Sequence, residues 1–519
     1  MPRPFWWRAA AAMTAIVLGG AFAAVPAQAE PTTPTYTNAD VGFEESIYQK
    51  VDPGPRLDRE WEYAGGRNPF IRVDLEWTWL EQTSCPGPCA DGLDWSGIDK
   101  TVDAAHQRGF RVMLILDYTP KWANGGHESG KFFPTRDHDG DWADVVQAAV
   151  EHFGTKVQAY EVWNEPNLQG FGDFDVPGTD AQRVPERKKR YWELVKLAYP
   201  RIKQGCPSCV VVAGGSAQGT PNGYASSSAA WLQAGYDEHA RDYFDAVAHH
   251  PYFPNQAGPD ARMCESPWDN PFGPIYRNDK GQLCGELAAV RDVLVRNGDA
   301  GKKIWGTEWG VPTKEPYRPN DSLARVRNIQ VDAVHLWRSV DWTGPLFLFT
   351  YQDSPRSEDC VKSPNLGDCN FGVETNEVDG SHHPKSPLFE DMRTALQGGW
   401  PDRLYWNQAV FENSALRSPD GRFFLWMQGD GNLVLYRTVT ATTPAQVLWS
   451  VTNKHGSLLI NQADGSLALK NRQGVSAWNS GSYQGPDRTA TLILQNDGNL
   501  VLYRDSDRKA IWASNTCCR

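Results

Sequence analysis

Two glutamates stand where a short apolar segment of this chain ends and a loop begins. Glu165 follows Asn164 just after the strand-like run Val157–Val162, and Glu308 comes just after the apolar run 303–305. Two carboxyl groups that meet in one place can cleave a glycosidic bond, because one protonates the leaving oxygen while the other attacks the sugar or activates water. The Asn164 amide beside Glu165 would hold a sugar hydroxyl. The pattern therefore predicts glycoside hydrolysis if the fold brings the two glutamates together.

The segments around these glutamates have the pattern of a barrel. Between residues 38 and 398, short runs rich in Val, Ile, Leu and Phe alternate with longer helical patterns, as in parallel sheets whose strands are buried on both faces. The predicted strands are Val41–Ser46, Phe70–Glu76, Arg111–Tyr118, Val157–Asn164, Val210–Ser216, Phe244–His250, Lys303–Glu308 and Pro345–Tyr351. The predicted helices include Ile98–Gly109, Trp142–Phe153, Pro185–Gln204, Gly285–Asn297 and Leu323–Val340. This α/β alternation predicts a (β/α)8 TIM barrel, with both glutamates at the carboxyl ends of strands and the connection Phe253–Gly285 over that face.

A different pattern begins after Gly399. Helical periodicity gives way to short alternating strands with Asp-Gly turns. The motif Gln428-x-Asp430-x-Asn432-x-Val434-x-Tyr436 recurs at residues 495–503, and a changed copy at 462–470 has Ser466 and Lys470 in place of Asn and Tyr. Each copy is followed by a tryptophan, the three being Trp449, Trp478 and Trp512. These repeats predict an all-β domain of three related sheet units around one core, with a polar binding strip on one strand face.

The first unit resembles glycoside hydrolase clan A, which includes families 5 and 39. The resemblance covers residues 38–398 and rests on Asn164-Glu165 at the end of the fourth strand and Glu308 at the end of the seventh. It implies a retaining, double-displacement mechanism without metal or cofactor, in which Glu165 is the general acid/base and Glu308 the nucleophile, about 5–5.5 Å apart. Asn164 would bind the hydroxyl next to the reacting carbon, and His250 would line the site.

Four further residues are predicted to support the nucleophile or the substrate. Arg72 and Tyr252 also match the clan and would keep Glu308 ionised, since donors and a positive charge favour the carboxylate. The clan usually places a Trp under the bound sugar at the end of strand eight, and here Tyr351 would replace it. Trp122 would either line a subsite or pack within its loop.

Other titratable residues in or near the strands fit a structural role. Glu161 shares a strand with Glu165 but lies deeper in the predicted barrel, and His249 is also expected to be structural. The pair His382-His383 has no spaced third ligand, so no metal site is predicted. The acidic residues that could be buried ion-pair partners are Glu44, Glu76, Asp117 and Glu161.

The second unit resembles the bulb-type, mannose-binding lectin domain, an all-β fold of the β-prism II type with three repeats. The resemblance implies that polar side chains of each intact motif bind sugar hydroxyls while the valine packs on the ring. Little binding is expected at the middle copy, which lacks the motif's Asn and Tyr. The implied sugar-binding residues are Gln428, Asp430, Asn432, Tyr436, Gln495, Asp497, Asn499 and Tyr503.

The first 29 residues have the pattern of a secretory signal peptide. Arg3 and Arg8 precede the apolar run Ala9–Ala24, and Ala27-Gln28-Ala29 fits a small-x-small cleavage rule. An uncleaved membrane anchor is the alternative, although the run is marginal for a span of about 20 residues. The sequence predicts a secreted, extracellular protein that has no membrane span after cleavage.

Ten cysteines in an exported chain are expected to form disulfides. The Cys206-Pro-Ser-Cys209 motif could suggest redox chemistry or zinc, but no second ligand pair lies nearby, so a loop disulfide is favoured. The sequence does not fix the connectivity, but the cysteines fall in five pairs that are close in sequence: Cys85/Cys89, Cys206/Cys209, Cys264/Cys284, Cys360/Cys369 and Cys517/Cys518.

The 519 residues thus predict a signal peptide at 1–29, a catalytic barrel at 30–400 and a lectin domain at 401–519. The formal net charge of −12 argues against nucleic acid as a partner. The predicted function is cleavage of O-glycosidic bonds in a poly- or oligosaccharide, with a mannose-type glycan at the lectin domain. Two alternatives are a non-catalytic carbohydrate-binding protein and a cell-wall transglycosylase that uses the same residues.

Overall fold

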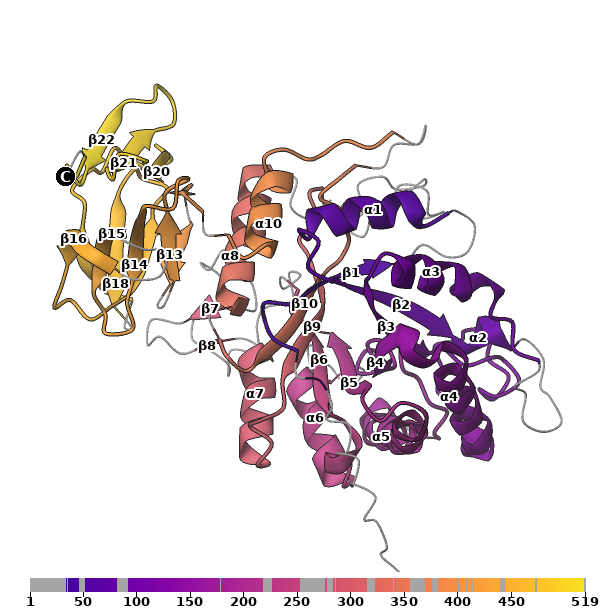
Figure 1. Cartoon of the computed structure of the whole chain (residues 1–519). Coiled ribbons are helices and arrows are strands. Elements are labelled where there is room, and N and C mark those ends of the chain that lie inside the picture. The colour runs from indigo at the N-terminus through magenta and orange to yellow at the C-terminus, as the bar shows by residue number, and fades with distance from the viewer. Residues whose placement is uncertain are drawn as a thin grey trace, which may run out of the picture. The chain divides into compact units, whose positions relative to one another are not determined.

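In the computed structural model, strands and helices make up most of the residues that the structure describes (Figure 1). The described residues are 34, 36–45, 52–81, 92–177, 179–217, 226–252, 276–277, 283–284, 286–314, 323–338, 340–354, 369–375, 381–399, 401–406, 408–411, 414–438, 444–471 and 474–517. The predicted signal peptide and most of the predicted Phe253–Gly285 connection lie outside them.

Eight parallel strands close into a barrel in the order β1-β10-β9-β6-β5-β4-β3-β2. They are β1 (Val41–Glu45), β2 (Phe70–Glu76), β3 (Arg111–Asp117), β4 (Val157–Val162), β5 (Val210–Ala217), β6 (Ala246–His250), β9 (Ile304–Trp309) and β10 (Thr343–Leu348). The fold prediction is confirmed, and every predicted strand overlaps an observed one. A separate two-stranded hairpin pairs β7 (Tyr276–Arg277) with β8 (Leu283–Cys284).

The interior of the barrel changes from apolar to charged along the strands. Phe70, Met113 and Trp305 belong to an apolar cluster of inward side chains near the strand starts. Because side chains alternate along a strand, the same face of β2 next presents Arg72, two residues further toward the carboxyl end. Charge is therefore concentrated at the carboxyl ends of the strands, where a barrel enzyme carries out its chemistry.

The helices lie outside the strands and cover them with apolar faces (Figure 1). The capping box of Thr179 and Gln182 sets the start of α5, because each side chain satisfies a backbone donor at the helix end. The helices are α1 (Gly54–Tyr63), α2 (Trp77–Leu80), α3 (Ser96–Gln107), α4 (Asp139–Phe153), α5 (Asp180–Gly205), α6 (Ser228–Asp237), α7 (Glu286–Arg296), α8 (Leu323–Arg338) and α10 (Leu388–Leu396).

The residues after 400 form three antiparallel four-stranded sheets, as the repeats predict. Their orders are β13-β14-β15-β16, β12-β17-β18-β19 and β11-β20-β21-β22. The strands are β11 (Arg403–Leu404), β12 (Ala409–Phe411), β13 (Ser414–Arg417), β14 (Phe423–Met427), β15 (Leu433–Thr438), β16 (Pro444–Val451), β17 (Gly456–Asn461), β18 (Leu467–Asn471), β19 (Ser476–Asn479), β20 (Ala490–Leu494), β21 (Leu500–Arg504) and β22 (Ala510–Ala513).

The three sequence repeats after residue 400 adopt similar structures. The indole rings of Trp449, Trp478 and Trp512 contact one another, with centroids 5.6, 5.8 and 5.9 Å apart, against a leucine-rich core. The Asp-Gly turn of each copy puts its glycine at a φ of +84°, +78° and +84°, which glycine adopts without a steric penalty. The three tryptophans and turns thus join the three sheets around a shared core.

One predicted disulfide is confirmed, and one predicted pair is wrong. Cys206 and Cys209 are joined in the loop between α5 and β5, and Cys369 is also disulfide-bonded. Cys517 is an exposed free thiol, so it does not pair with Cys518. The predicted pairs that involve Cys85, Cys89, Cys264, Cys284 and Cys360 fall outside the described side chains.

Among the described residues, no helix combines the length and apolar character that a membrane crossing needs.

Candidate active site and sugar-binding sites

The turn after β4 presents Glu165 through an uncommon backbone conformation. Trp163 and Glu165 have φ values of +69° and +47°, which cost about 1–3 kcal/mol each for residues other than glycine. The surrounding structure compensates: the Trp163 indole is buried and donates to the carbonyl of Phe171 at 2.6 Å, and the Glu165 amide donates to Gly215 at 2.9 Å. The turn thus fixes the direction of the Glu165 side chain.

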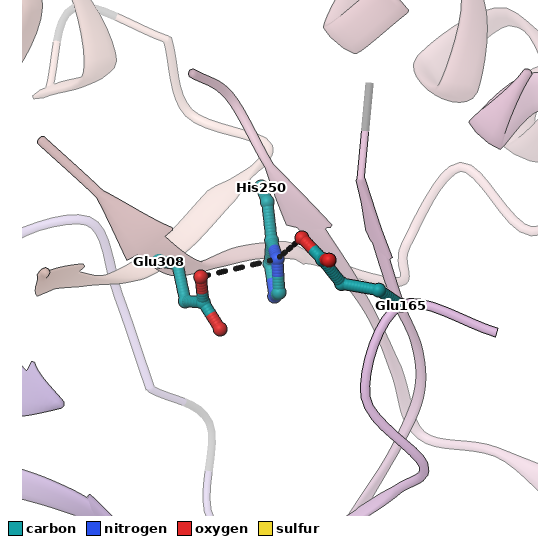
Figure 2. Close-up of side chains that lie close together, drawn as sticks. All are labelled: Glu165, His250 and Glu308. Carbon is teal, nitrogen blue, oxygen red and sulfur yellow. Dashed lines mark hydrogen bonds and ion pairs between the residues drawn. The ribbon is translucent and has the colours of Figure 1, made fainter. Parts of the chain in front are cut away.

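Glu165 and Glu308 meet at His250, which ends β6 (Figure 2). The His250 Nδ1 atom lies 3.0 Å from Glu165 Oε1 and 3.5 Å from Glu308 Oε2. One oxygen from each carboxylate and this nitrogen all lie within 4.8 Å of one another. The glutamates that the sequence predicts to meet therefore do so, and the Glu165 side chain is 14% exposed while that of Glu308 is 9% exposed.

Arg72 is the fully buried centre of an ion-pair network under this site. Its Nη1 donates to Glu308 Oε1 and to Glu44 Oε2, both at 2.7 Å, and its Nε donates to Glu161 Oε2 at 2.6 Å. Its Nη2 donates to Asn164 Oδ1 at 3.0 Å. The Asn164 side chain also hydrogen-bonds Tyr118, so one N–H of its NH2 group is left to bind a substrate hydroxyl.

Glu308 is held in its ionised form. Burial raises the pKa of Glu308, but the charges of His250 and Arg72 and the hydrogen bonds from Tyr252 and Arg72 outweigh burial, so that the pKa is lowered. The Tyr252 hydroxyl donates to Glu308 Oε2 at 2.7 Å. Burial and then the charge of Glu308 raise the pKa of Tyr252, which keeps it a donor. These contacts agree with the supporting roles predicted for Arg72 and Tyr252.

Thr307 links His250 to the buried network, and sequence reasoning missed this residue. Its hydroxyl donates to Glu161 Oε1 at 3.0 Å and lies 3.1 Å from His250 Nε2. The signal that could reveal it is its place just before Glu308 on an inward-facing strand position. His249, by contrast, points to the Ser216 carbonyl, and burial lowers its pKa to about 3, which fits the predicted structural role.

His250 and the two glutamates also have the ligand types of a metal site. Both oxygens of Glu308, however, already accept hydrogen bonds from Arg72 and Tyr252. The buried Arg72 guanidinium would also repel a cation placed against Glu308. The donor set therefore favours a hydrogen-bonded carboxylate pair over a metal ion.

The prediction for Tyr351 is wrong. Its side chain is buried, packs on Phe43 and Tyr63, and donates to Glu374 Oε1 at 2.8 Å. The physical reason is that β10 ends at Leu348, so strand alternation cannot be extended to residue 351. Phe349 is instead the partly exposed ring near the site, 6.0 Å from Tyr252 by centroids.

Trp122 is occupied by packing contacts. Its ring lies 5.5 Å from Trp77 and 5.1 Å from His138, and its Nε1 donates to the Glu81 carbonyl at 3.3 Å. These contacts favour the loop-packing alternative over a subsite.

The remaining acidic candidates fall into two groups. Glu44 and Glu161 are buried ion-pair partners of Arg72, as expected. Glu76 and Asp117 form no ion pair among the described residues, and burial followed by the charge of Asp74 raises the pKa of both, to about 7 for Glu76. The expectation of ion pairing is wrong for these two, because the cations that lower their pKa values, Lys131 for Glu76 and Arg72 for Asp117, do not form ion pairs with them.

The two intact lectin motifs have the same internal geometry. Gln428 Nε2 donates to the Tyr436 hydroxyl at 2.9 Å, and Gln495 Nε2 donates to Tyr503 at 3.0 Å. In each copy the Asn backbone amide, at Asn432 and Asn499, donates to the carboxylate of the preceding Asp, at Asp430 and Asp497. In both copies the motif's Gln, Asp and Asn lie in the turn that precedes β15 or β21 and its Tyr lies on that strand, so the polar strip spans the turn and the strand.

The middle copy uses its polar groups on itself. The Ser466 hydroxyl lies 2.6 Å from Asp464 Oδ1 and 3.2 Å from Gln462 Oε1. Lys470 stands where the other copies have the tyrosine that accepts from Gln. The middle copy thus lacks the Gln–Tyr hydrogen bond of the intact copies, and weak sugar binding there stays a prediction.

Comparison with known proteins gives two kinds of match. No protein-family model matches. A segment of 112 residues is 31% identical to the B-type lectin plumieribetin of Scorpaena plumieri, covering 21% of this chain and 90% of that protein. A segment of 113 residues is 29% identical to a mannose-specific lectin of Aloe arborescens, covering 22% of this chain and 95% of that protein.

Among solved structures, a family 39 glycoside hydrolase from Bacteroides cellulosilyticus WH2 matches with a TM-score of 0.51 and 18% identity, over 93% of this chain and 82% of that one. At this identity the likeness concerns the fold.

Proposed function

We propose that the chain, which belongs to the B-type lectin family through its 112-residue matching segment, is a glycoside hydrolase that also holds a glycan. The observation that carries the hydrolase is the carboxylate pair, with oxygens of Glu165 and Glu308 within 4.8 Å at the carboxyl ends of barrel strands. An inverting enzyme needs about 6.5–9.5 Å to admit water between its carboxyl groups, so the spacing supports a retaining mechanism. The fold shared with a family 39 hydrolase supports the assignment as a glycoside hydrolase.

Each contact in the site has a function in a double displacement. Glu308, ionised and oriented by Arg72 and Tyr252, attacks the anomeric carbon while Glu165 protonates the leaving oxygen. Water then hydrolyses the glycosyl ester after Glu165 takes its proton. His250, 3.0 Å from Glu165, orients this proton-transferring carboxyl group.

The lectin part would retain the enzyme on a glycan. We assign it to residues 401–519, with sugar sites at the first and third motif copies and a mannose-type ligand, since a matched relative is named mannose-specific. With the predicted signal peptide at residues 1–29, the protein would be secreted and would act on an extracellular poly- or oligosaccharide.

Replacing Glu165 with Gln tests the acid/base assignment. With a poor leaving group, kcat/KM should fall by about 10²–10⁴-fold, because the departing oxygen is no longer protonated. With a dinitrophenyl glycoside, kcat/KM should fall by less than about tenfold, and a product burst should appear because hydrolysis of the ester lacks its base. Stopped-flow release of dinitrophenolate measures both. Equal losses on the two substrates would mean that Glu165 has another role.

Replacing Tyr252 with Phe tests how the nucleophile is kept ionised. Activity requires ionised Glu308 and is lost as pH falls through its lowered pKa. Loss of the Tyr252 hydrogen bond raises that pKa, so the acid limb of the kcat/KM profile should move to higher pH. Tyr236→Phe is the matched control, because that hydroxyl also donates to a carboxylate, Asp299 Oδ2 at 2.8 Å, away from the site. An acid limb that moves equally in both variants, or in neither, would contradict the assignment.

Removing the motif asparagines tests the lectin sites. The double variant Asn432→Ala and Asn499→Ala should lose at least about tenfold in affinity for immobilised mannan, because each site leaves hydrogen bonds unmade. Its hydrolysis of small soluble substrates should stay normal. Ser466→Ala at the equivalent position of the middle copy is the control and should bind like the parent protein. A result in which only Ser466→Ala loses binding would reverse the assignment of the copies.

A further inference from the structure

Three aromatic rings lie together on the sheet that carries the first lectin motif. Phe424 stacks on Tyr436 with centroids 5.2 Å apart and planes at 26°, and Trp426 lies 6.5 Å from Tyr436 and 6.2 Å from Phe424. All three side chains are partly exposed. We call Phe424, Trp426 and Tyr436 the aromatic platform.

The platform is continuous with the first sugar site. In the register of β14 and β15, Trp426 lies opposite Val434 and Phe424 opposite Tyr436, and opposite residues share one face of a sheet. Val434 and Tyr436 are both motif positions. The Tyr436 hydroxyl accepts from Gln428, so this residue belongs to the sugar site and to the platform at once.

Strand β14 divides its side chains between the core and the surface. Phe423, Leu425 and Met427 are buried in the core of the domain, whereas Phe424 and Trp426 alternate with them on the outer face. The core of the sheet is therefore complete without the two outer rings. Both rings remain partly exposed on the outer face, where Val434 is buried, and their open faces can contact a ligand.

The other two copies have no aromatic residue at the positions of Phe424 and Trp426. In the third copy, Ile493 lies opposite Val501, and Thr491 lies opposite Tyr503 and donates to Asp505 Oδ1 at 2.7 Å. In the middle copy, Ile460 and Leu458 occupy the two places. The same strands form in all three copies, so the fold does not require aromatic residues there.

We propose that the first site binds an oligosaccharide, with one sugar in the polar motif and the next stacked on the aromatic platform, while the third site binds a single sugar. The inference rests on the proposed lectin function. The C–H face of a pyranose ring is apolar and flat and matches the face of an indole or phenyl ring. The platform would thus make the first site specific for internal or extended glycan chains.

The test compares two probes, methyl α-mannoside and an α-linked mannotriose, by titration calorimetry on the full chain. The Asn499→Ala variant disables the third site, so it reports binding at the first site. The Asn432→Ala variant disables the first site, so it reports binding at the third. The first site should prefer the trisaccharide by about tenfold and the third by less than about twofold. Trp426→Ile and Phe424→Thr, which install the residues of the third copy, should each lower the preference of the first site toward that of the third.

The outcomes separate the inference from the function on which it rests. A trisaccharide preference that survives both substitutions, with normal melting temperatures, would overturn the platform while leaving the lectin function in place. Self-association that disappears in Trp426→Ile, with an unchanged preference, would identify a second copy of the chain as the occupant and also overturn it. Failure of the parent protein to bind any sugar of a panel would overturn both.

Discussion

Glu308→Gln is expected to lower turnover by at least about 10⁴-fold while the protein stays folded. An amide cannot form the glycosyl ester, so the first displacement has no nucleophile. The substitution keeps the shape of the side chain and an oxygen that can accept from Arg72 or Tyr252. Initial rates on aryl glycosides, measured beside the thermal unfolding midpoint, would check both halves of the expectation.

Glu44→Gln is the matched control for this variant. Glu44 accepts from the same Nη1 atom of Arg72 at the same 2.7 Å, and it is as buried as Glu308. Burial raises the pKa of Glu44 well above its usual value in spite of the Arg72 charge, so the variant reports what loss of one hydrogen-bonded carboxyl group does to the network while the nucleophile remains. A far smaller loss of turnover is expected. If the two variants lost activity equally, disturbance of the network rather than loss of nucleophilic attack would explain the effect.

The meeting of the two glutamates was predictable because strand ends are visible in sequence. An apolar run that stops at a loop marks where a parallel strand delivers a side chain to the mouth of a barrel, and both Glu165 and Glu308 have that context. Phe349 could not be distinguished from Tyr351 in this way. The choice depends on where β10 stops, and strand ends are the least certain part of a prediction from pattern.

The lectin sites show a related division. The motif itself identifies the polar residues of the first and third copies, but the expected strand face is only partly right, because Gln428, Asp430 and Asn432 lie in the turn between β14 and β15. The aromatic platform depends on β14, a neighbouring strand outside the motif, and on the register that sets Trp426 beside Val434. Register is a tertiary property, so only the structure reveals the difference between the two intact copies.

Arg72 connects the fold to the site, and its loss should be the most destabilising single change in the barrel. Arg72→Met would leave the carboxylates of Glu44, Glu161 and Glu308 buried without their shared cation. Leaving a buried charge unpaired typically costs about 3–5 kcal/mol, so a loss of free energy of unfolding of that size is expected at pH 8. Denaturant unfolding followed by tryptophan fluorescence would measure it.

The pH dependence of this loss identifies its cause. Without the cation, the folded carboxylates have higher pKa values than in the unfolded chain, so the folded state of the variant binds more protons and its stability falls as pH rises. The deficit should therefore be smaller near pH 5 than at pH 8. Arg190→Met is the control, because Arg190 is equally buried but its partners Asp139 and Glu193 are 37% and 23% exposed and can be hydrated. A pH-independent deficit, equal to that of Arg190→Met, would mean that Arg72 contributes packing and backbone contacts rather than charge compensation.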